Sequence, residues 1–390
     1  MKQSRRVHLH PSTAKQDAIS TAAPAPPTTT SNQATTIKPI TLSTKDNNEL
    51  TQQDPPQTLP GPASTQTLFG HTAGVCALLA SDDRYIISGS IDMTLRVWSR
   101  GSMHCYHVLR GHRDVVCAVA LTRTYLLSAS HDMTVGVWLA QQDFRLQRRL
   151  QGHTGHVTHV AFLPSDEHIA VTCSEDKTLR LWRVDVGLCT GVLATGHSSR
   201  VSCVLPLSSA IWSGGADATV CVWTLPDGHL LTSFRAHAKT VQSIVSFASD
   251  SIVATSSNDG RVQLYDAKAL SLLRRLEFGT PLYWMDILRR SQDRVVVSSG
   301  DGRLLLIDAT LGTSSEISVR RGRWLAHVAL WDPWVACAAA DDFVLIVDVR
   351  SGEIKAEMQI EGVHGVAWLN GTTLLLCGAD GLIHAANFAI

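Results

Sequence analysis

The stretch that decides the fold reads SGSIDMTLRVW at Ser88–Trp98 and returns as SASHDMTVGVW at Ser128–Trp138. Each copy is an apolar strand, a tight turn around an Asp, and a second strand of alternating character, which predicts a half-buried β-hairpin. The unit recurs about every forty residues, and a period of that length indicates a repeat architecture. Three more copies keep all its features: TCSEDKTLRLW at Thr172–Trp182, SGGADATVCVW at Ser213–Trp223 and TSSNDGRVQLY at Thr255–Tyr265.

Three weaker copies carry the repeat to the end of the chain. They are VSSGDGRLLLI at Val297–Ile307, CAAADDFVLIV at Cys337–Val347 and LCGADGLIHAA at Leu376–Ala386. Upstream of the first five copies stand Gly70-His71, Gly111-His112, Gly152-His153, Gly196-His197 and Ala236-His237, each followed by another short apolar strand. Because no helix-forming stretch of useful length interrupts this region, we expect an all-β domain over residues 64–390.

The composition favours a soluble intracellular protein. The 390 residues include 34 Lys and Arg against 34 Asp and Glu, so no net charge favours nucleic acid or an anionic membrane as the main partner. The longest weakly charged apolar stretch, Ala326–Ala340, is too short to span a bilayer, and no secretory leader is recognisable. Nine cysteines without a Cys-x-x-Cys pair indicate reduced thiols, which favours the cytoplasm or nucleus.

Residues 1–63 have a different composition and are expected to be a disordered tail. They are rich in Ser, Thr, Pro and Ala, as in TAAPAPPTTTSNQATT, and contain too few large apolar side chains to offset the chain entropy of folding. Arg5, Arg6 and Lys15, with Asp17 as the single nearby acid, weakly resemble an organellar transit peptide. A solvated tail is favoured because Pro11 and the later Pro-Ala run would break an amphipathic helix.

The repeated residues resemble those of a known family, the WD-repeat β-propellers. The shared pattern is a Gly-His pair, a Ser or Thr, an Asp four positions later and a Trp six positions beyond it. This resemblance covers residues 64–390 and implies four-stranded blades around a central channel. The Asp that closes the family's Trp-Asp pair is usually missing, since Ser99, Leu139 and Arg183 follow the first three Trp; Asp266 keeps it after Tyr265.

The number of units predicts the number of blades. Eight Asp-turn hairpins predict eight blades, and a seven-bladed ring with one hairpin outside it is the alternative. Thr67–Phe69 has no earlier blade to join, so we expect it to complete the last blade beside the strands of Gly362–Phe388. This closure would remove the open sheet edges. Units six to eight lack the His and the Trp, so their blades must rely on apolar packing.

The repeated His, Ser or Thr, and Asp have a catalytic and a structural interpretation. They are the parts of a nucleophilic triad, but an enzyme needs one nucleophile, whereas five equivalent sets at a fixed spacing indicate a scaffold. The resemblance implies that each set, with its aromatic residue, is a structural tetrad of buried hydrogen bonds. The tetrads are His71, Ser88, Asp92 and Trp98; His112, Ser128, Asp132 and Trp138; His153, Thr172, Asp176 and Trp182; His197, Ser213, Asp217 and Trp223; and His237, Thr255, Asp259 and Tyr265.

We expect no metal site, cofactor or catalytic site. His153, His156 and His159 lie together in GHTGHVTHV, but His156 and His159 would point to opposite faces of a strand, and the tetrad already uses His153. The MHCYH segment at 103–107 suits a packing or surface role in an outer strand. The sequence contains no glycine-rich phosphate loop before a helix and no acidic cluster suited to calcium.

Binding of other proteins is the function that the resemblance implies. Propellers of this family commonly use a top face, built from the residues around each turn Asp and at the start of each innermost strand. In this sequence the candidates are Cys76, Ile91, Met93, Cys117, His131, Met133, Thr158, Glu175, Lys177, Arg200, Ser202, Gln242, Asn258 and Met285. Ile91, Met93, Met133, Cys76 and Cys117 would form an apolar, adaptable patch on blades one and two. Ordinary variation at loop positions is the alternative.

The eight units also resemble the propellers of F-box ubiquitin-ligase receptors. Those propellers bind phosphorylated peptides with a ring of arginines, whereas the matching positions here hold only Arg200 and Lys177. The segment ahead of the propeller is also not expected to supply a helical F-box module. We therefore predict a non-enzymatic scaffold that docks peptide segments of partner proteins. The alternatives are a substrate adaptor in ubiquitin-dependent degradation and, from another class, a propeller hydrolase.

Overall fold

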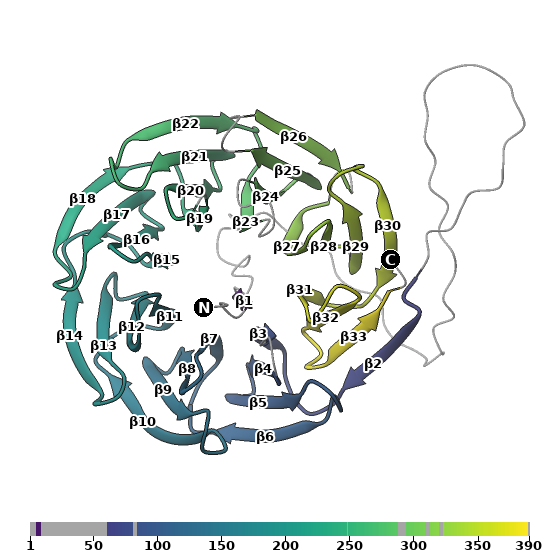
Figure 1. The fold of residues 1–390 in the computed structure, drawn as a ribbon, viewed down its shortest axis with the longest axis horizontal. Helices are drawn as coiled ribbons and strands as arrows, with labels where there is room; N and C mark the ends of the chain where they lie inside the picture. Colours follow the sequence, from purple (N-terminus) through teal and green to yellow (C-terminus); the bar gives the residue numbers. More distant parts are fainter. Residues whose placement is uncertain are drawn as a thin grey trace, which may run out of the picture.

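The protein is an eight-bladed β-propeller. The computed structural model describes residues 5–8, 61–80, 84–247, 249–287, 294–308, 313–319 and 323–388. Within these ranges every regular element is a β-strand, and the strands form eight antiparallel sheets around a central channel (Figure 1). The prediction of an all-β, eight-bladed propeller is confirmed, and the alternative of seven blades with one hairpin outside is wrong.

Each blade orders four strands from the channel outward (Figure 1). The innermost strands are β3 (Val75–Ala80), β7 (Val116–Leu121), β11 (Val157–Leu163), β15 (Val201–Pro206), β19 (Val241–Phe247), β23 (Leu282–Ile287), β27 (Leu325–Trp331) and β31 (Val363–Trp368). The second strands are β4 (Tyr85–Ser90), β8 (Tyr125–Ser130), β12 (Asp166–Ser174), β16 (Ala210–Gly215), β20 (Ile252–Ser257), β24 (Arg294–Ser299), β28 (Trp334–Ala339) and β32 (Thr373–Gly378).

The two outer rows of strands complete the blades. The third strands are β5 (Thr94–Ser99), β9 (Thr134–Leu139), β13 (Leu179–Arg183), β17 (Thr219–Thr224), β21 (Arg261–Asp266), β25 (Arg303–Asp308), β29 (Phe343–Asp348) and β33 (Ile383–Asn387). The outermost strands are β6 (Cys105–Arg110), β10 (Arg145–Gln151), β14 (Leu188–Leu193), β18 (Leu230–Arg235), β22 (Leu272–Glu277), β26 (Thr313–Ser318), β30 (Ile354–Gln359) and, in the last blade, β2 (Ser64–Leu68).

The sequence of each strand matches its depth in the ring. All six residues of β3 (VCALLA) are buried, because neighbouring blades cover both faces of an innermost strand. The outermost β14 (LCTGVL) alternates between exposed and half-buried residues, because solvent covers one of its faces. Blades six to eight pack apolar side chains at the positions that hold the Ser or Thr and the aromatic residue in blades one to five, since Val297, Ile307, Cys337, Val347 and Leu376 are fully buried.

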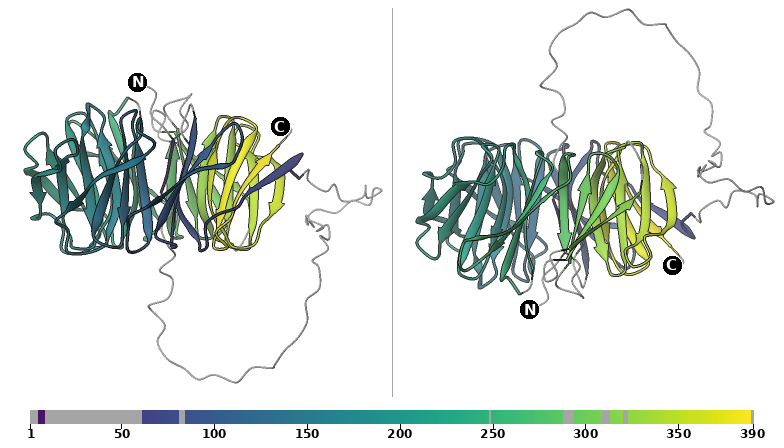
Figure 2. Two further views of the ribbon diagram at one scale, coloured as in Figure 1. Left: turned by 90° about the horizontal axis from the view of Figure 1, so that it is seen from below. Right: turned by 90° about the horizontal axis from the view of Figure 1, so that it is seen from above.

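Strand β2 closes the ring by joining the two ends of the propeller domain. It pairs antiparallel with β33, with Ser64 opposite Asn387 and Leu68 opposite Ile383 (Figures 1 and 2). The Asn387 amide nitrogen donates to Ser64 Oγ at 3.0 Å. The predicted closure is thus confirmed, with Phe69 lying just beyond the strand and 71% exposed.

The predicted tail contains one described element. Strand β1 (Arg5–His8) lies inside the ring and pairs antiparallel with β3, with Arg5 opposite Ala80 and His8 opposite Ala77 (Figure 1). At these four residues the structure differs from the predicted disorder, because the edge of β3 supplies backbone hydrogen-bonding partners from outside the tail. Residues 1–4 and 9–60 lie outside the described residues, so disorder and organellar targeting remain predictions for them.

Candidate docking face

A backbone hydrogen bond repeated in all eight blades builds the top face. In each blade the amide of the residue before the turn Asp donates to the carbonyl of the residue before the innermost strand. The N···O distances lie between 2.8 and 3.2 Å for the pairs Ile91–Gly74, His131–Val115, Glu175–His156, Ala216–Arg200, Asn258–Thr240, Gly300–Pro281, Ala340–Trp324 and Ala379–Gly362. We call these sixteen residues the rim. The bond holds the two loops of each blade side by side, so their side chains form one continuous surface.

A buried tetrad supports the rim of blade one. Trp98 Nε1 donates to Ser88 Oγ at 2.8 Å, and Ser88 Oγ lies 2.8 Å from His71 Nε2. The indole N–H can only donate, so Ser88 Oγ accepts from Trp98 and donates its own O–H to His71 Nε2. The other ring nitrogen of His71 then carries the proton, and Nδ1–H donates to Asp92 Oδ2 at 2.8 Å. Burial lowers the pKa of His71, although Asp92 raises it, which favours this neutral tautomer at pH 7.

Blades two to four contain the same hydrogen-bonded chain. The His Nε2 to hydroxyl distance is 2.7 Å for His112–Ser128 and His153–Thr172 and 2.8 Å for His197–Ser213. The Trp donates to the same hydroxyl at 2.9 Å in all three blades: Trp138 to Ser128, Trp182 to Thr172 and Trp223 to Ser213.

Blade five departs from the tetrad expected there. His237 bonds to Thr255 at 2.9 Å and to Asp259 at 3.2 Å. The Tyr265 hydroxyl instead donates to Gln263 Oε1 at 2.6 Å. The polar atom of Tyr is at the tip of the ring, whereas that of Trp is on its flank, so Tyr265 reaches a different partner and does not complete a tetrad.

The turn Asp connects the tetrad to the rim. In blade one, Asp92 Oδ2 also accepts from the Thr72 amide at 3.1 Å, while Oδ1 accepts from the amide and the hydroxyl of Thr94 at 3.0 and 2.7 Å. Burial alone would raise the pKa of Asp92, but the hydrogen bonds from Thr94 and His71 outweigh it and lower the pKa to about 2. The carboxylate therefore stays ionised and fixes both loops of the blade.

The same geometry argues against a nucleophilic role for the tetrad hydroxyls. Ser88, Ser128, Thr172, Ser213 and Thr255 are each 0% exposed. In blades one to four the hydroxyl lies between an indole and an imidazole, which leaves it no approach to a substrate. These groups are structural supports of the face above them.

Three apolar rim and turn side chains are exposed on the neighbouring blades one and two. Ile91, Met93 and Met133 are 47%, 46% and 43% exposed. Met93 and Met133 follow the turn Asp and have φ values of 67° and 68°, in the left-handed region, which disfavours side chains with a Cβ. The same position is left-handed in all eight blades, with φ from 65° to 86°, and in the other six it holds Lys177, Ala218, Gly260, Gly302, Asp342 and Gly381. We call Ile91, Met93 and Met133 the apolar sector.

A polar and charged sector lies beside it on blades two to four. His131 stacks on His156, and His156 Nδ1 lies 3.3 Å from Glu175 Oε2. Arg200 Nη1 lies 4.0 Å from the other carboxylate oxygen of Glu175, and Lys177 is exposed on the adjacent turn. We call His131, His156, Glu175 and Arg200 the charged sector. Gln242 and Asn258, farther round the ring, are half-buried.

Four predicted binding residues are buried and do not reach the surface. Cys76, Cys117, Ser202 and Met285 are 3%, 4%, 6% and 2% exposed. The second residue of an innermost strand instead links its blade to the next one. Cys117 Sγ donates to Val157 O at 3.0 Å, half-buried Thr158 Oγ1 to Val201 O at 3.2 Å, and Ser202 Oγ to Val241 O at 2.5 Å.

Sequence reasoning missed an aromatic pair on blades six and seven. Strand β23 begins at Leu282, so the position expected for Met285 belongs to Tyr283. Tyr283 lies against the rim residue Trp324, with ring centroids 5.3 Å apart, and Trp324 is 37% exposed. The residue before each innermost strand, aligned across the repeats, was the signal that could have found Trp324 and His156.

The histidines of GHTGHVTHV do not converge on one point. His153 belongs to a tetrad, His156 lies on the rim, and His159 is 7% exposed within β11. Across the described ranges, no group of three or more His, Cys, Asp or Glu residues is arranged to hold a metal ion. The same ranges contain no helix with the length and apolar character needed to cross a bilayer.

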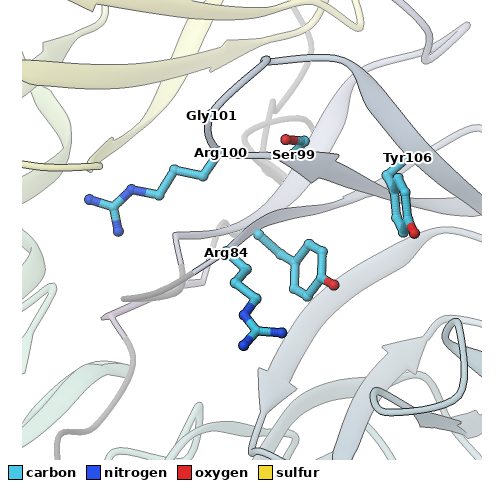
Figure 3. A pocket seen from close by; sticks show the side chains of 6 residues that line it. Arg84, Ser99, Arg100, Gly101 and Tyr106 are labelled. Atoms are coloured by element: carbon cyan, nitrogen blue, oxygen red, sulfur yellow. The ribbon is translucent and has the colours of Figure 1, made fainter.

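An open pocket of about 480 Å³ lies on blade one, at the strand ends opposite the Asp turn. It is lined by Arg84, Tyr85, Ser99, Arg100, Gly101 and Tyr106 (Figure 3). Arg100 Nη2 donates to Leu369 O at 2.7 Å and so connects blade one to a loop of blade eight. Tyr85 and Tyr106 stack at 6.3 Å, as part of an aromatic cluster. The lining suits a contact between blades and contains no paired nucleophile and base.

Comparison with known proteins agrees with this architecture. The family model described as "WD domain, G-beta repeat" matches residues 63–99, 103–138, 144–183, 187–224 and 228–266. The computationally designed Ika8 protein superposes with a TM-score of 0.72, covering 83% of this chain and 98% of that one at 22% identity, which supports the fold alone. The fold and the repeated tetrads define a repeat propeller. The chain belongs to the WD-repeat family.

Two kinds of curated relative match about half of this chain. The nuclear distribution protein nudF of Emericella nidulans is 34% identical over 200 residues, which are 50% of this chain and 45% of nudF. The guanine nucleotide-binding protein subunit beta of Arabidopsis thaliana is 29% identical over 224 residues, or 52% of this chain and 58% of that protein. The chain thus spans about half the length of these relatives. The comparisons support a general role as a protein-interaction scaffold.

Proposed function

We propose that this propeller is a non-enzymatic scaffold whose top face docks peptide segments of partner proteins. The observation that carries the proposal is the apolar sector, in which Ile91, Met93 and Met133 are held nearly half-exposed on turns fixed by buried tetrads. Apolar side chains that are left exposed together on a fixed support suit contact with another protein.

The surroundings of the apolar sector suit a segment of mixed character. Methionine adapts its shape to different apolar partners, and the adjoining charged sector offers both cationic and anionic groups to orient a bound chain. The relative from Arabidopsis is named as a subunit, which is consistent with a propeller that works in an assembly. Action in the cytoplasm or nucleus is part of the same proposal.

Affinity purification of the intact protein from its own cells tests the proposal. The test variant carries Met93→Asp and Met133→Asp, because Asp tolerates the left-handed region and removes the apolar surface. The matched control carries Leu231→Asp and Leu272→Asp, two residues 55% and 45% exposed on outermost strands. We expect the test variant to lose specific partners that the control keeps, at equal melting temperature. Recovery of the same partners by both would refute docking on this face.

The recovered proteins also distinguish the alternatives. Cullin-ligase subunits that depend on the apolar sector would support the degradation adaptor. The hydrolase alternative is tested by measuring hydrolysis of a broad panel of model esters and phosphoesters. The rates are compared between the wild type and an Asp132→Asn variant. Equal background rates for both would leave that alternative without support from the tetrad.

A further inference from the structure

The channel-facing edge of the innermost strands is the part of the propeller that the blades leave unpaired. Within its blade an innermost strand has a neighbour on its outer side only, so its other edge presents backbone N–H and C=O groups to the channel. On β3 this edge is covered, because β1 pairs with it over the register from Arg5–Ala80 to His8–Ala77. Of the eight sheets in the described part of the chain, this is the one with five strands.

We propose that the channel-facing edge of β3 is a strand-addition site, and that the chain's own N-terminal segment is its intramolecular ligand. In strand addition the main-chain hydrogen bonds provide the affinity. This mode suits β3, whose six side chains are all buried and leave its backbone as the group that meets the channel. Figures 1 and 2 show β1 inside the ring, between the two faces of the propeller.

The direction of β1 relates the segment to the top face. Strand β3 starts directly after the rim residue Gly74, so its Val75 end is the top-face end. Because β1 is antiparallel, His8, opposite Ala77, lies nearer the top face than Arg5, opposite Ala80. The segment therefore runs through the channel toward the mouth on the top face. Any partner that enters the channel from that side competes with it for the edge of β3.

Tethering explains how so short a strand could stay bound. Strands β1 and β2 lie in one chain with 55 residues between them, so the segment is covalently tied to the domain that carries its site. Such a tether holds a ligand at an effective concentration near the millimolar range. A four-residue strand that binds weakly as a free peptide would therefore still occupy the edge in the intact chain.

Hydrogen exchange in the full chain tests occupancy of the edge. Two variants remove the pairing: deletion of residues 1–10, and Val7→Pro, which lacks a backbone N–H and disfavours a paired strand. We expect the channel-facing amides of β3 to exchange about tenfold faster in both variants, because they lose their partner. Amides of β15, on blade four, should be unchanged and serve as the internal control. Equal exchange of β3 in the wild type and the deletion variant would overturn the proposal.

A peptide of residues 1–12 tests the binding mode on the deletion variant. The labelled peptide should bind saturably, and the wild type should bind it less because its own segment occupies the edge. Successive amides of a strand point to opposite sides. Two methylated peptides use this alternation: one is N-methylated at Arg6 and His8, and the other at Arg5 and Val7. Only one of the two should therefore lose binding. No binding of the unmodified peptide, or equal binding of both methylated peptides, would contradict strand addition. These readouts need no partner protein, so their failure is separable from failure of the docking proposal.

Discussion

The imidazole ring of His131 lies parallel to that of His156, with ring centroids 4.5 Å apart and planes inclined by 8°. The two residues come from neighbouring blades, and both belong to the charged sector. Burial lowers the pKa of His131, and His156 lowers it further, while Asp114 and Glu175 raise it. The protonated form of His131 is therefore disfavoured both by burial and by its stacked neighbour.

Replacing one ring should change the titration of the other. In His156→Asn the pKa of His131 should rise, because the neighbouring ring that lowers it is removed, yet remain below its usual 6.5, because burial is the larger cause. Titration of ring ¹³C signals in histidine-labelled protein measures this directly. His229→Asn, on an exposed loop, is the matched control. A lower or unchanged pKa of His131 in the test variant would show that the rings are not coupled.

Removing a turn Asp should destabilise its blade. In blade two, Asp132 accepts hydrogen bonds from His112 at 2.8 Å and from the amides of Arg113 and Thr134 at 3.0 Å. Asp132→Ala leaves these donors without partners, at about 1–3 kcal/mol for each one that stays buried. The melting temperature should fall by several degrees, measured by calorimetry. Asp227→Ala, on an exposed turn, should melt like the wild type, and an unchanged melting curve for Asp132→Ala would count against the tetrad in blade two.

Acid should weaken the fold before the carboxylates titrate. Burial lowers the pKa of His71, His153, His197 and His237 below the usual 6.5. The unfolded chain therefore takes up these protons first as pH falls through 6.5, and the free energy of unfolding decreases. A second loss should follow below pH 3.8 and down to about pH 2, because the pKa of Asp92 and that of Asp176 lie near 2.

Urea unfolding between pH 8 and 5 measures the histidine contribution. Each proton taken up on unfolding contributes about 1.4 kcal/mol per pH unit to the slope of the unfolding free energy against pH. His153→Gln removes one such group, so its slope should be smaller by up to one proton even though its stability is lower. A slope equal to that of the wild type would mean that His153 titrates alike in the folded and unfolded chain.

Blade four offers a stabilising substitution. In blades one, two, three and five a Ser two residues before the turn Asp connects the two rim loops; for example, Ser90 Oγ donates to Ala73 O at 2.9 Å and accepts from the Asp92 amide at 3.0 Å. Gly215 stands at this position in blade four, where His197 is 3.3 Å from both oxygens of Asp217. A Cβ at Gly215 would lie 2.4 Å from Asp217 Oδ1 and 2.6 Å from His197 Nδ1, so both side chains must move to the arrangement that blades one to three show beside a Ser.

We expect Gly215→Ser to raise the stability of the protein. The hydroxyl would supply the missing connection, worth about 1 kcal/mol, and Asp217 would turn toward the single-oxygen contact seen in blades one to three. Calorimetry should show a melting temperature higher by one to a few degrees, in line with about 1 kcal/mol in a large domain. Gly101→Ser, where a Cβ has no neighbour within 4 Å, is the control. A lower melting temperature would mean that Asp217 and His197 cannot yield the space.

The blade number and the tetrads followed from the sequence because each depends on contacts within one repeat. A fixed spacing from His to Asp to Trp places the same atoms together in blades one to four, and the family resemblance that this spacing carries assigned His71, Asp92 and Trp98 to one tetrad. Ring closure followed too, since Thr67–Phe69 had no earlier blade to join and the last blade needed a fourth strand; the strand that closes the ring is β2, Ser64–Leu68.

Contacts between repeats were decided by the tertiary structure alone. Cys117 and Ser202 occupy positions that a single repeat leaves open to solvent, and the next blade buries them. His131 precedes the turn Asp of blade two, whereas His156 precedes the innermost strand of blade three. The two rings stack only because these blades are neighbours in the folded ring. The partner of β1 is likewise the free edge of another strand, a feature that exists only once the ring has closed. A repeating sequence pattern therefore predicts the contacts within one blade. The contacts between blades depend on how the folded blades pack against each other.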